Sequence, residues 1–193
     1  MSDILRLVTL DQRHIQQFER LMGAKEFGGC FCAVWHAYGP DWEARCKERS
    51  GENLKATVDL VANGGHAGYL VRRDDDGAFV GWTAAGPKTA FPFLKDRPGS
   101  RLGAWDDSVW AVACLAIAFA HRGRGYSLDI VKAVAELAKR AGAKSLEAYP
   151  LEPAPEGSEY RGSKKLYESA GLTLAEGEPA GESHALRMEL SLS

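Results

Sequence analysis

The sequence lacks an excess of charge of either sign. Lys and Arg together number 24 and Asp and Glu number 26, which leaves a formal net charge of −2 at pH 7. Such a balance offers no basic surface for binding nucleic acid, and a neutral or cationic small partner fits it at least as well. We therefore expect no nucleic-acid partner.

No pattern typical of a leader or a membrane span is visible in the sequence, and cysteines are few. The start, MSDILRLVTL, has no positive charge followed by a long apolar run, and no segment approaches the roughly 18 apolar residues of a membrane span. The four cysteines are Cys30, Cys32, Cys46 and Cys114, which without a leader are expected as reduced thiols. We expect a cytoplasmic protein without a membrane partner, and a single domain over residues 1–193.

Hydrophobic periodicity predicts an alternation of strands and helices. Strands are expected at 4–10, 66–73, 78–87, 109–117, 145–149 and 185–192, and helices near 12–22, 54–62, 126–141 and 163–170. Thr9 and Gln12 resemble a capping box for the first helix. Residues 24–50 and 87–107 lack a clean period and are expected as functional loops, the first with one short helix.

Two connections fix the type of sheet. The DDDG segment between two strands predicts an antiparallel hairpin, whereas the strand–helix–strand unit at 109–149 predicts a parallel pair with a right-handed crossover. The pattern therefore indicates a mixed α/β sheet.

The segment AFAHRGRGYS, residues 118–127, joins an apolar strand to an amphipathic helix. Glycines at 123 and 125 allow a ligand close to the backbone, and the helix start supplies unpaired N–H groups beside two arginines. The device suits a pyrophosphate, although an exposed basic turn is the alternative. A dinucleotide fingerprint would need a third glycine, and a Walker loop would need Gly-Lys-Ser/Thr.

The stretch CLAIAFAHRGRGYSLDIVKAVAELAKRAGAKSLEAYPLE resembles the acetyl-CoA-binding core of the GNAT superfamily of acyl-CoA N-acyltransferases. The superfamily signature matches Arg122 and Gly125, with Ser127 as a departure at its last position, and LYESAGL resembles a later helix. A bacterial subgroup with Cys-x-Cys-x-x-Trp is matched by Cys30, Cys32 and Trp35, and VGW, a following proline and EAYP also recur. The resemblance covers roughly residues 25–190 in order.

The resemblance implies an α/β fold with a mixed, mostly antiparallel sheet, splayed central strands and flanking helices. It also implies acetyl-CoA as co-substrate, with the pantetheine arm along one strand and the pyrophosphate on the turn that follows. The implied cofactor residues are Leu115, Ala116, Ile117, Arg122, Gly123, Arg124, Gly125, Tyr126 and Ser127.

Tyr167 matches the tyrosine that the superfamily uses, and we predict it as general acid for the departing thiolate; the alternative is a packing role beside Leu166. Tyr160 stands where many members have a cofactor-binding asparagine, so that contact is not carried over. The general base stays open between water and five side chains: Asp106, Asp107, Glu26, His36 and Glu147.

Acceptor selectivity is expected in the two long loops. The predicted acceptor residues are Glu26, Phe31, Cys32, Trp35, His36, Trp82 and Asp106. The spacing of Cys30, Cys32, His36 and Cys46 lacks the paired knuckles of a zinc site, and neither Cys30 nor Cys32 has an evident partner that would make it an acetyl carrier. We therefore expect no metal, and interpret the loop cysteines as pocket residues.

These features predict an N-acetyltransferase that moves acetyl from acetyl-CoA directly to a primary amine of a small molecule. An amino sugar or aminoglycoside-type antibiotic, an amino acid and a polyamine are the candidate acceptors, the first implying antibiotic resistance. A non-catalytic acyl-CoA sensor and a protein-modifying acetyltransferase are the alternatives. The oligomeric state stays open, with a homodimer as one option.

Overall fold

A mixed sheet forms the centre of the computed structural model, which describes residues 4–95, 97, 100–101, 103–175 and 185–192. The sheet is 7-stranded in the order β1-β2-β3-β4-β5-β7-β6, with β4 and β5 parallel and the other neighbours antiparallel. The strands are β1 (Leu5–Thr9), β2 (Tyr69–Arg73), β3 (Phe79–Pro87), β4 (Val109–Ile117), β5 (Ser145–Ala148), β6 (Thr173–Leu174) and β7 (Met188–Ser191). The predicted mixed, mostly antiparallel sheet is confirmed.

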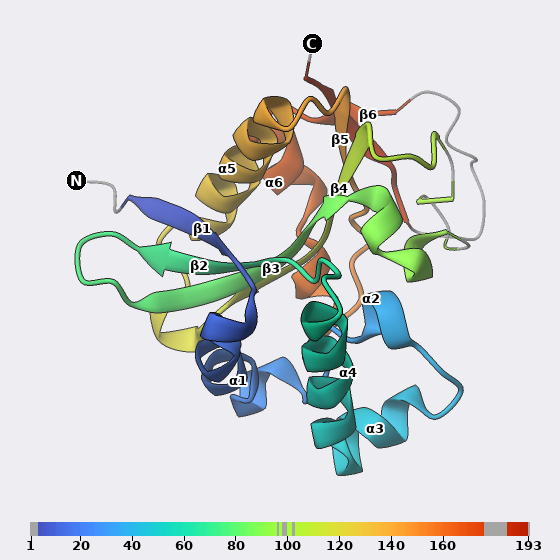
Figure 1. Cartoon of the computed structure of the whole chain (residues 1–193). Coiled ribbons are helices and arrows are strands. Elements are labelled where there is room, and N and C mark those ends of the chain that lie inside the picture. The colour runs from blue at the N-terminus through green and yellow to red at the C-terminus, as the bar shows by residue number, and fades with distance from the viewer. Residues whose placement is uncertain (1–3, 96, 98–99, 102, 176–184, 193) are drawn as a thin grey trace.

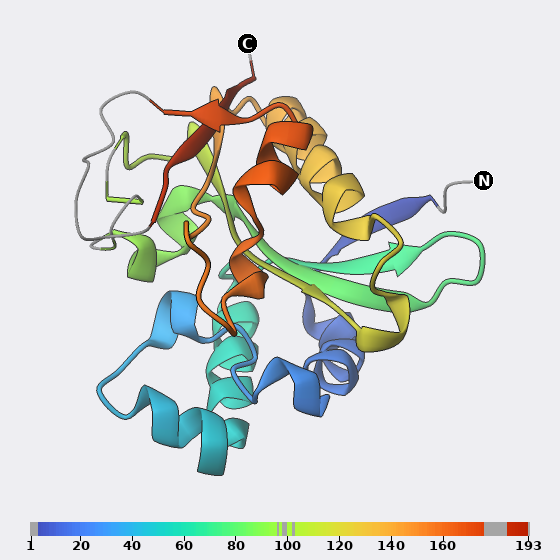
Figure 2. The ribbon, with the colours of Figure 1, turned by 180° about the vertical axis from the view of Figure 1, so that it is seen from behind.

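Helices cover both faces of this sheet (Figures 1 and 2). The α-helices are α1 (Ile15–Met22), α2 (Val34–Ala37), α3 (Trp42–Glu48), α4 (Ser50–Ala62), α5 (Tyr126–Arg140) and α6 (Lys164–Ser169). Short 3-10 turns are η1 (Gln12–His14), η2 (Lys25–Phe27), η3 (Lys88–Ala90), η4 (Pro92–Leu94), η5 (Phe119–His121) and η6 (Glu159–Arg161). One hydrophobic core lies under α5 and α6, and a second lies on the opposite face under α1 and α4.

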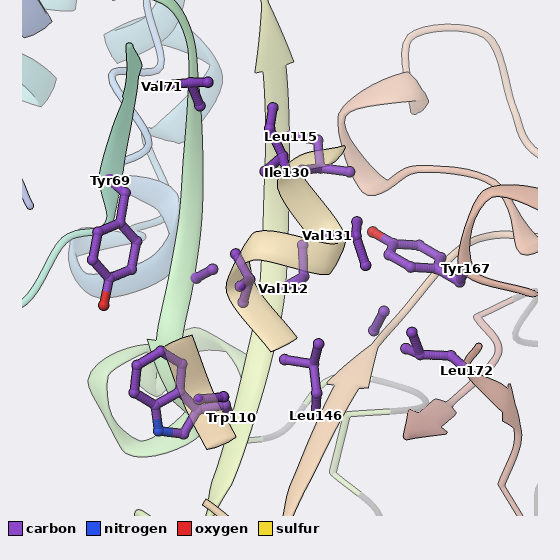
Figure 3. Close-up of a cluster of buried hydrophobic side chains, with 14 of the residues drawn as sticks. Tyr69, Val71, Trp110, Val112, Leu115, Ile130, Val131, Leu146, Tyr167 and Leu172 are labelled. Atoms are coloured by element: carbon purple, nitrogen blue, oxygen red, sulfur yellow. The ribbon is translucent and has the colours of Figure 1, made fainter. Parts of the chain in front are cut away.

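The central strand β4 contributes side chains to both cores, which explains its unbroken apolar sequence VWAVACLAI. Trp110, Val112 and Leu115 pack in the α5 core (Figure 3). Ile117, further along the strand, belongs to the same core. The alternation shifts between these pairs because a β-bulge interrupts the register with β3: Ala84 pairs with Cys114 and Ala85 with Val112. Ala113 is the extra residue, and the bulge bends the strand at the middle of the sheet.

The parallel partners β4 and β5 separate just after that bulge. Their register ends at Val112 with Ala148, where β5 itself ends, while β4 continues to Ile117 paired only with β3. Within the described part of the chain, residues 113–117 have no strand partner on the β5 side, and η6 packs beside them. This divergence is the splay that the resemblance implied.

Several element boundaries differ from the sequence prediction. The predicted capping box is wrong, because Asp11 rather than Thr9 caps the first turn by accepting from the Arg13 amide at 2.9 Å. Helix α4 starts at Ser50, ahead of its first apolar residue Leu54, since a polar first turn carries no apolar period. Residues 24–50 hold α2 and α3 where one helix was expected.

Other parts of the prediction hold or were missed. The DDDG hairpin, β4, α5 and β5 lie where the periodicity placed them. Strand β6 was missed because Thr173–Leu174 is too short to alternate. Residues 96, 98–99 and 102 of the predicted 87–107 loop lie outside the described residues. Within the described ranges, each helix is too short or too polar to cross a bilayer.

Candidate active site

A cavity of about 870 Å³ lies where β4 leaves β5. Its walls come from the end of β4, the start of α5, the turn around η6 and the loop that carries η2 and α2. The lining residues are Met22, Glu26, Phe27, Gly28, Cys30, Cys32, Val34, Trp35, Trp42, Cys114, Leu115, Ala116, Ile117, His121, Arg122, Gly123, Gly125, Tyr126, Ser127, Gly157, Glu159 and Tyr160. The cavity therefore joins the predicted cofactor strand and turn to the predicted acceptor loop.

The turn before α5 is open toward this cavity. Gly123 and Gly125 adopt left-handed backbone angles, with φ of 74° and 82°, and Gly125 is the N-cap of α5. A Cβ added at either glycine would meet no atom within 4 Å, so nothing in the chain fills the space over the turn. Among the described residues, the amides of Gly123, Arg124 and Gly125 have no hydrogen-bond partner. Amides exposed at the positive end of a helix dipole form an anion site, which fits a pyrophosphate.

The two arginines of the turn have different positions. The Nε atom of Arg122 donates to the carbonyl oxygen of Ile117 at 3.0 Å, and its guanidinium carbon lies 5.7 Å from the centre of the Phe119 ring. Arg122 thus ties the turn to the last residue of β4 while its charge stays at the cavity. Arg124 does not line the cavity, and it is the one predicted cofactor residue that does not.

The flank of β4 beyond the splay supplies a second element of the cavity. Leu115, Ala116 and Ile117 line it, and their backbone faces the side on which β5 has ended. Unpaired N–H and C=O groups along an extended strand can bind another extended chain with amide groups. The pantetheine arm of acetyl-CoA carries such amides, so the strand and the turn together fit the co-substrate.

Three of the predicted acceptor residues line the cavity, namely Glu26, Cys32 and Trp35. The backbone N–H of Phe119 donates to Glu26 Oε1 at 3.2 Å, and this bond is the main cause that lowers the pKa of Glu26. Glu26 thus links the acceptor loop to the turn η5 and stays ionised. Trp35 packs across the cavity from Tyr160, with 6.4 Å between ring centres.

The other four predicted acceptor residues do not line the cavity. Phe31 packs in the α1 core against Phe18, at 6.1 Å between ring centres. Trp82 is fully buried and its Nε1 donates to the sulfur of Cys32 at 3.0 Å. The Nε2 atom of His36 lies 3.4 Å from the hydroxyl of Thr57.

Asp106 lies at the opposite end of β4 from the cavity. It precedes the start of β4, whereas the cavity lies at the end of that strand. Its carboxylate accepts from the amide of Ser108 at 2.8 Å and so closes the turn into the strand. The irregular 87–107 segment gives no sign in the sequence of which end of β4 it lies at.

The five candidate bases separate in the structure. Glu26 lines the cavity, and the other four do not. Burial, followed by the charge of Arg45, lowers the pKa of His36 to about 4. Glu147 lies in a buried ion pair with Lys88 at 2.7 Å, and the hydroxyl of Thr89 is hydrogen-bonded to Asp107.

Tyr167 lies behind the cavity wall. Its side chain is fully buried, and Figure 3 shows the ring reaching from α6 toward Val131 of α5. Its hydroxyl donates to the carbonyl oxygen of Arg161 at 2.7 Å. Burial, and then the nearby Cys114, raise the pKa of this hydroxyl above its usual range, so it stays protonated. Cys114 lines the cavity and Tyr167 does not, so Tyr167 lies behind Cys114 as seen from the cavity.

The cysteines gather around the acceptor loop without forming a disulfide. All four are free thiols, and the sulfurs of Cys32 and Cys114 lie 3.5 Å apart. The contact with Cys114 is the main cause that raises the pKa of Cys32, and the contact with Cys32 does the same for Cys30. Protonated thiols are poor acetyl carriers. Over the described ranges, no group of three or more His, Cys, Asp or Glu side chains is arranged for a metal ion.

Sequence reasoning missed several cavity residues. Met22, Val34 and His121 carried no functional signal, because each also suits an ordinary helix or turn. Glu159 lies in the connector after β5, whose proline- and glutamate-rich sequence indicated only a linker. Tyr160 was the one sign in the sequence that this segment borders the site, because it stands where many family members have a cofactor-binding asparagine. Tyr160 lines the cavity.

Comparison with known proteins agrees with this geometry. The model of the acetyltransferase (GNAT) family matches residues 31–171. No curated protein matches the chain by sequence.

Among solved structures, an aminoglycoside acetyltransferase AAC(6')-Ib in complex with ribostamycin and coenzyme A superposes with a TM-score of 0.60 at 15% identity, over 99% of this chain and 94% of the other. A mutant of spermidine N-acetyltransferase SpeG from Vibrio cholerae gives 0.59 at 13% identity, over 98% and 94%. At these identities the structural matches show a shared fold.

Proposed function

Because the chain belongs to the acetyltransferase (GNAT) family, we propose that it transfers the acetyl group of acetyl-CoA directly to a primary amine of a small molecule. Its family makes it an acyltransferase with acetyl-CoA as co-substrate. The observation that carries the proposal is the cavity that joins the open glycine turn and the unpaired flank of β4 to the aromatic acceptor loop. One cavity thus offers a place for the donor and a place for the acceptor.

The chemistry requires one bond to form and one to break. The lone pair of a neutral amine attacks the thioester carbonyl carbon, the carbon–sulfur bond breaks, and its electron pair leaves with sulfur as thiolate. We assign the proton for that thiolate to the Tyr167 hydroxyl, which is protonated; burial raises its pKa and makes it a weak acid, so the transfer requires it to leave its buried position. To reach the thiolate, the hydroxyl has to leave the carbonyl of Arg161. The excess proton on the amine passes to water or to Glu26, and solvent returns a proton to Tyr167.

The acceptor half of the cavity favours a cationic molecule. Its polar lining includes the carboxylates of Glu26 and Glu159, and its apolar lining includes the rings of Trp35, Trp42 and Tyr160. Aromatic faces and carboxylates both attract ammonium groups. An amino sugar, including an aminoglycoside antibiotic, and a polyamine are therefore the first acceptors to test. A positive result with an aminoglycoside would make the enzyme a resistance factor.

A screen with acetyl-CoA tests this proposal. Release of coenzyme A thiol is measured with ribostamycin, spermidine, free lysine and a lysine-containing peptide. We expect turnover with ribostamycin or spermidine. Turnover confined to the peptide would replace the proposal by a protein-modifying acetyltransferase, and binding of acetyl-CoA without turnover on any amine would replace it by an acyl-CoA sensor.

A double variant tests where acetyl-CoA binds. Acetyl-CoA stabilises the folded protein by mass action, so it raises the melting temperature with the logarithm of its concentration over its dissociation constant. The double variant Arg122→Glu with Gly125→Glu places carboxylates on the turn and is expected to abolish that rise. Arg140→Glu, at the far end of α5, is the matched charge reversal and should keep it. A full rise in the double variant would place the pyrophosphate elsewhere.

A further inference from the structure

The acceptor wall contains two consecutive non-glycine residues in the left-handed backbone region. Phe31 has φ of 44° and Cys32 has φ of 52°. Within the described ranges, no other residue besides glycine has a positive φ. L-amino acids with side chains adopt this conformation at a cost, and it persists where surrounding contacts hold it. The contacts that hold this turn therefore bear on the shape of the cavity, because Cys30, Cys32, Val34 and Trp35 all line it.

The first contact comes from β3. The indole Nε1 of Trp82 donates to the sulfur of Cys32 at 3.0 Å, and this sulfur lies 3.5 Å from that of Cys114 on β4. Trp82 is fully buried and Cys32 is 2% exposed. The side chain of Cys32 is thereby fixed between two strands at the base of the cavity.

The second contact comes from α4. The hydroxyl of Thr57 donates to the carbonyl oxygen of Phe31 at 2.9 Å, and His36 Nε2 lies 3.4 Å from the same hydroxyl. The amide of Asn53, one turn earlier on α4, donates to the carbonyl of Gly29 at 2.9 Å. Thr57 and Asn53 are both fully buried. These bonds hold the backbone of the turn from the side opposite to the cavity.

We propose that Trp82 and Thr57 are positioning residues for the acceptor: they hold Phe31 and Cys32 in the left-handed conformation and so set the wall that faces the end of β4. Neither residue lines the cavity, so each acts through the turn rather than by touching a ligand. The pyrophosphate turn precedes α5, and its residues make none of these contacts. Loss of either contact should therefore change how the acceptor binds and leave acetyl-CoA binding as it is. We call the hold of Trp82 and Thr57 on the backbone of Phe31 and Cys32 the clamp. The clamp rests on the contacts above, whereas the identity of the ligand rests on the proposed function.

Two substitutions of Thr57 separate hydrogen bonding from packing. Thr57→Val keeps the shape and removes the hydroxyl, whereas Thr57→Ser keeps the hydroxyl and removes a methyl group. Trp82→Phe removes the indole N–H together with the volume of one ring, so it tests the contact with Cys32 as a whole. Ser100→Ala is the control, because it deletes another buried hydroxyl, which donates to the Leu94 carbonyl outside the turn.

The first measurement is amide hydrogen exchange over residues 28–35, which needs no substrate. We expect faster exchange in Thr57→Val and Trp82→Phe, and exchange near wild type in Thr57→Ser and Ser100→Ala. The amides of Ala33 and Trp35, which bond to the carbonyls of Cys30 and Cys32, report the turn directly. Unchanged exchange in both Thr57→Val and Trp82→Phe would overturn the clamp.

The second measurement is steady-state kinetics with ribostamycin or spermidine, whichever the wild type acetylates, beside acetyl-CoA thermal shifts. We expect the KM for the amine to rise by about threefold to tenfold in Thr57→Val, the range of one buried hydrogen bond. Thr57→Ser should lie closer to wild type, and the acetyl-CoA shift should stay the same. A rise in KM for Thr57→Ser equal to that for Thr57→Val would mean that Thr57 acts by packing. If the wild type acetylates neither amine, the proposed acceptor class fails while the exchange measurement still decides the clamp.

Discussion

The ammonium of Lys88 lies 2.7 Å from the carboxylate of Glu147, and both side chains are about 1% exposed. Glu147 also accepts from the hydroxyl of Tyr149 at 2.6 Å and from Arg187 at 3.1 Å. One carboxylate therefore serves two cations and a phenol under the loop that carries Trp105, whose ring centre is 5.8 Å from the Lys88 nitrogen. This arrangement makes Glu147 structural, and the role of base considered for it from the sequence finds no support in its position.

Removing the carboxylate should destabilise the fold more than removing the lysine. Breaking one partner of a buried ion pair costs about 3–5 kcal/mol, because the remaining charge keeps its desolvation penalty. Glu147→Gln takes the negative charge from both Lys88 and Arg187, whereas Lys88→Met leaves the bond from Arg187 in place. Urea unfolding of the two variants should rank Glu147→Gln as the less stable. The reverse order would show that Lys88 is held mainly by its other surroundings.

Replacing Tyr167 by phenylalanine tests the assigned proton donor. Loss of a general acid reduces kcat by about 100-fold or more, while the retained ring keeps the packing of α6 against α5. Loss of the bond to the Arg161 carbonyl should cost about 1 kcal/mol in the free energy of unfolding. The acetyl-CoA thermal shift controls for binding and should be unchanged. A kcat equal to wild type would reduce Tyr167 to the packing role that the sequence left as the alternative.

His36 should make stability fall at mildly acidic pH. Its pKa is about 4 in the folded protein and about 6.5 when exposed, so the unfolded chain binds the proton more tightly. The stability that neutral His36 contributes is therefore complete above pH 6.5 and is lost as the pH falls toward 4. The shift corresponds to about 3 kcal/mol at most. His36→Gln should flatten this part of the curve of unfolding free energy against pH.

The comparison of His36→Gln with wild type matters more than either curve alone. Burial also lowers the pKa of His66, so a slope of the same sign persists in the variant. Carboxylates with lowered pKa, such as Asp11, lose their contribution only as the pH falls from 3.8 toward about 2, below this range, in both proteins. Parallel curves between pH 7 and 4.5 would show that His36 has solvent access in solution.

The sequence was sufficient for the parts of the fold in which local pattern and tertiary role coincide. The apolar segments of β2 and β3 on either side of DDDG and the apolar stripe of α5 each repeat one signal over several residues. The cofactor turn was also readable, because Gly123 and Gly125 have backbone angles that favour glycine. Arg124 does not line the cavity, whereas its neighbour Arg122 lines it and is bonded to the last residue of β4.

The acceptor loop was much less readable, and for a physical reason. Residues 24–50 have no period, so residue type did not reveal which side chains face the cavity and which face the core. Phe31, His36 and Trp82 were therefore taken as ligand contacts, whereas the structure uses them behind the wall. The left-handed angle of Cys32 could not be foreseen either, since residues other than glycine seldom adopt it and no local pattern marks it.

The end of β4 has a consequence for assembly. An exposed strand edge is a place where another protein chain can pair and start aggregation. Here the edge lies inside the sheet, with η6 packed beside it, instead of at the sheet's outer margin. A polypeptide strand, with side chains on both faces, would have to displace η6 to pair there, whereas a slender unbranched chain with widely spaced amides would not. The splay thus gives the protein a strand edge that discriminates by the width of its partner.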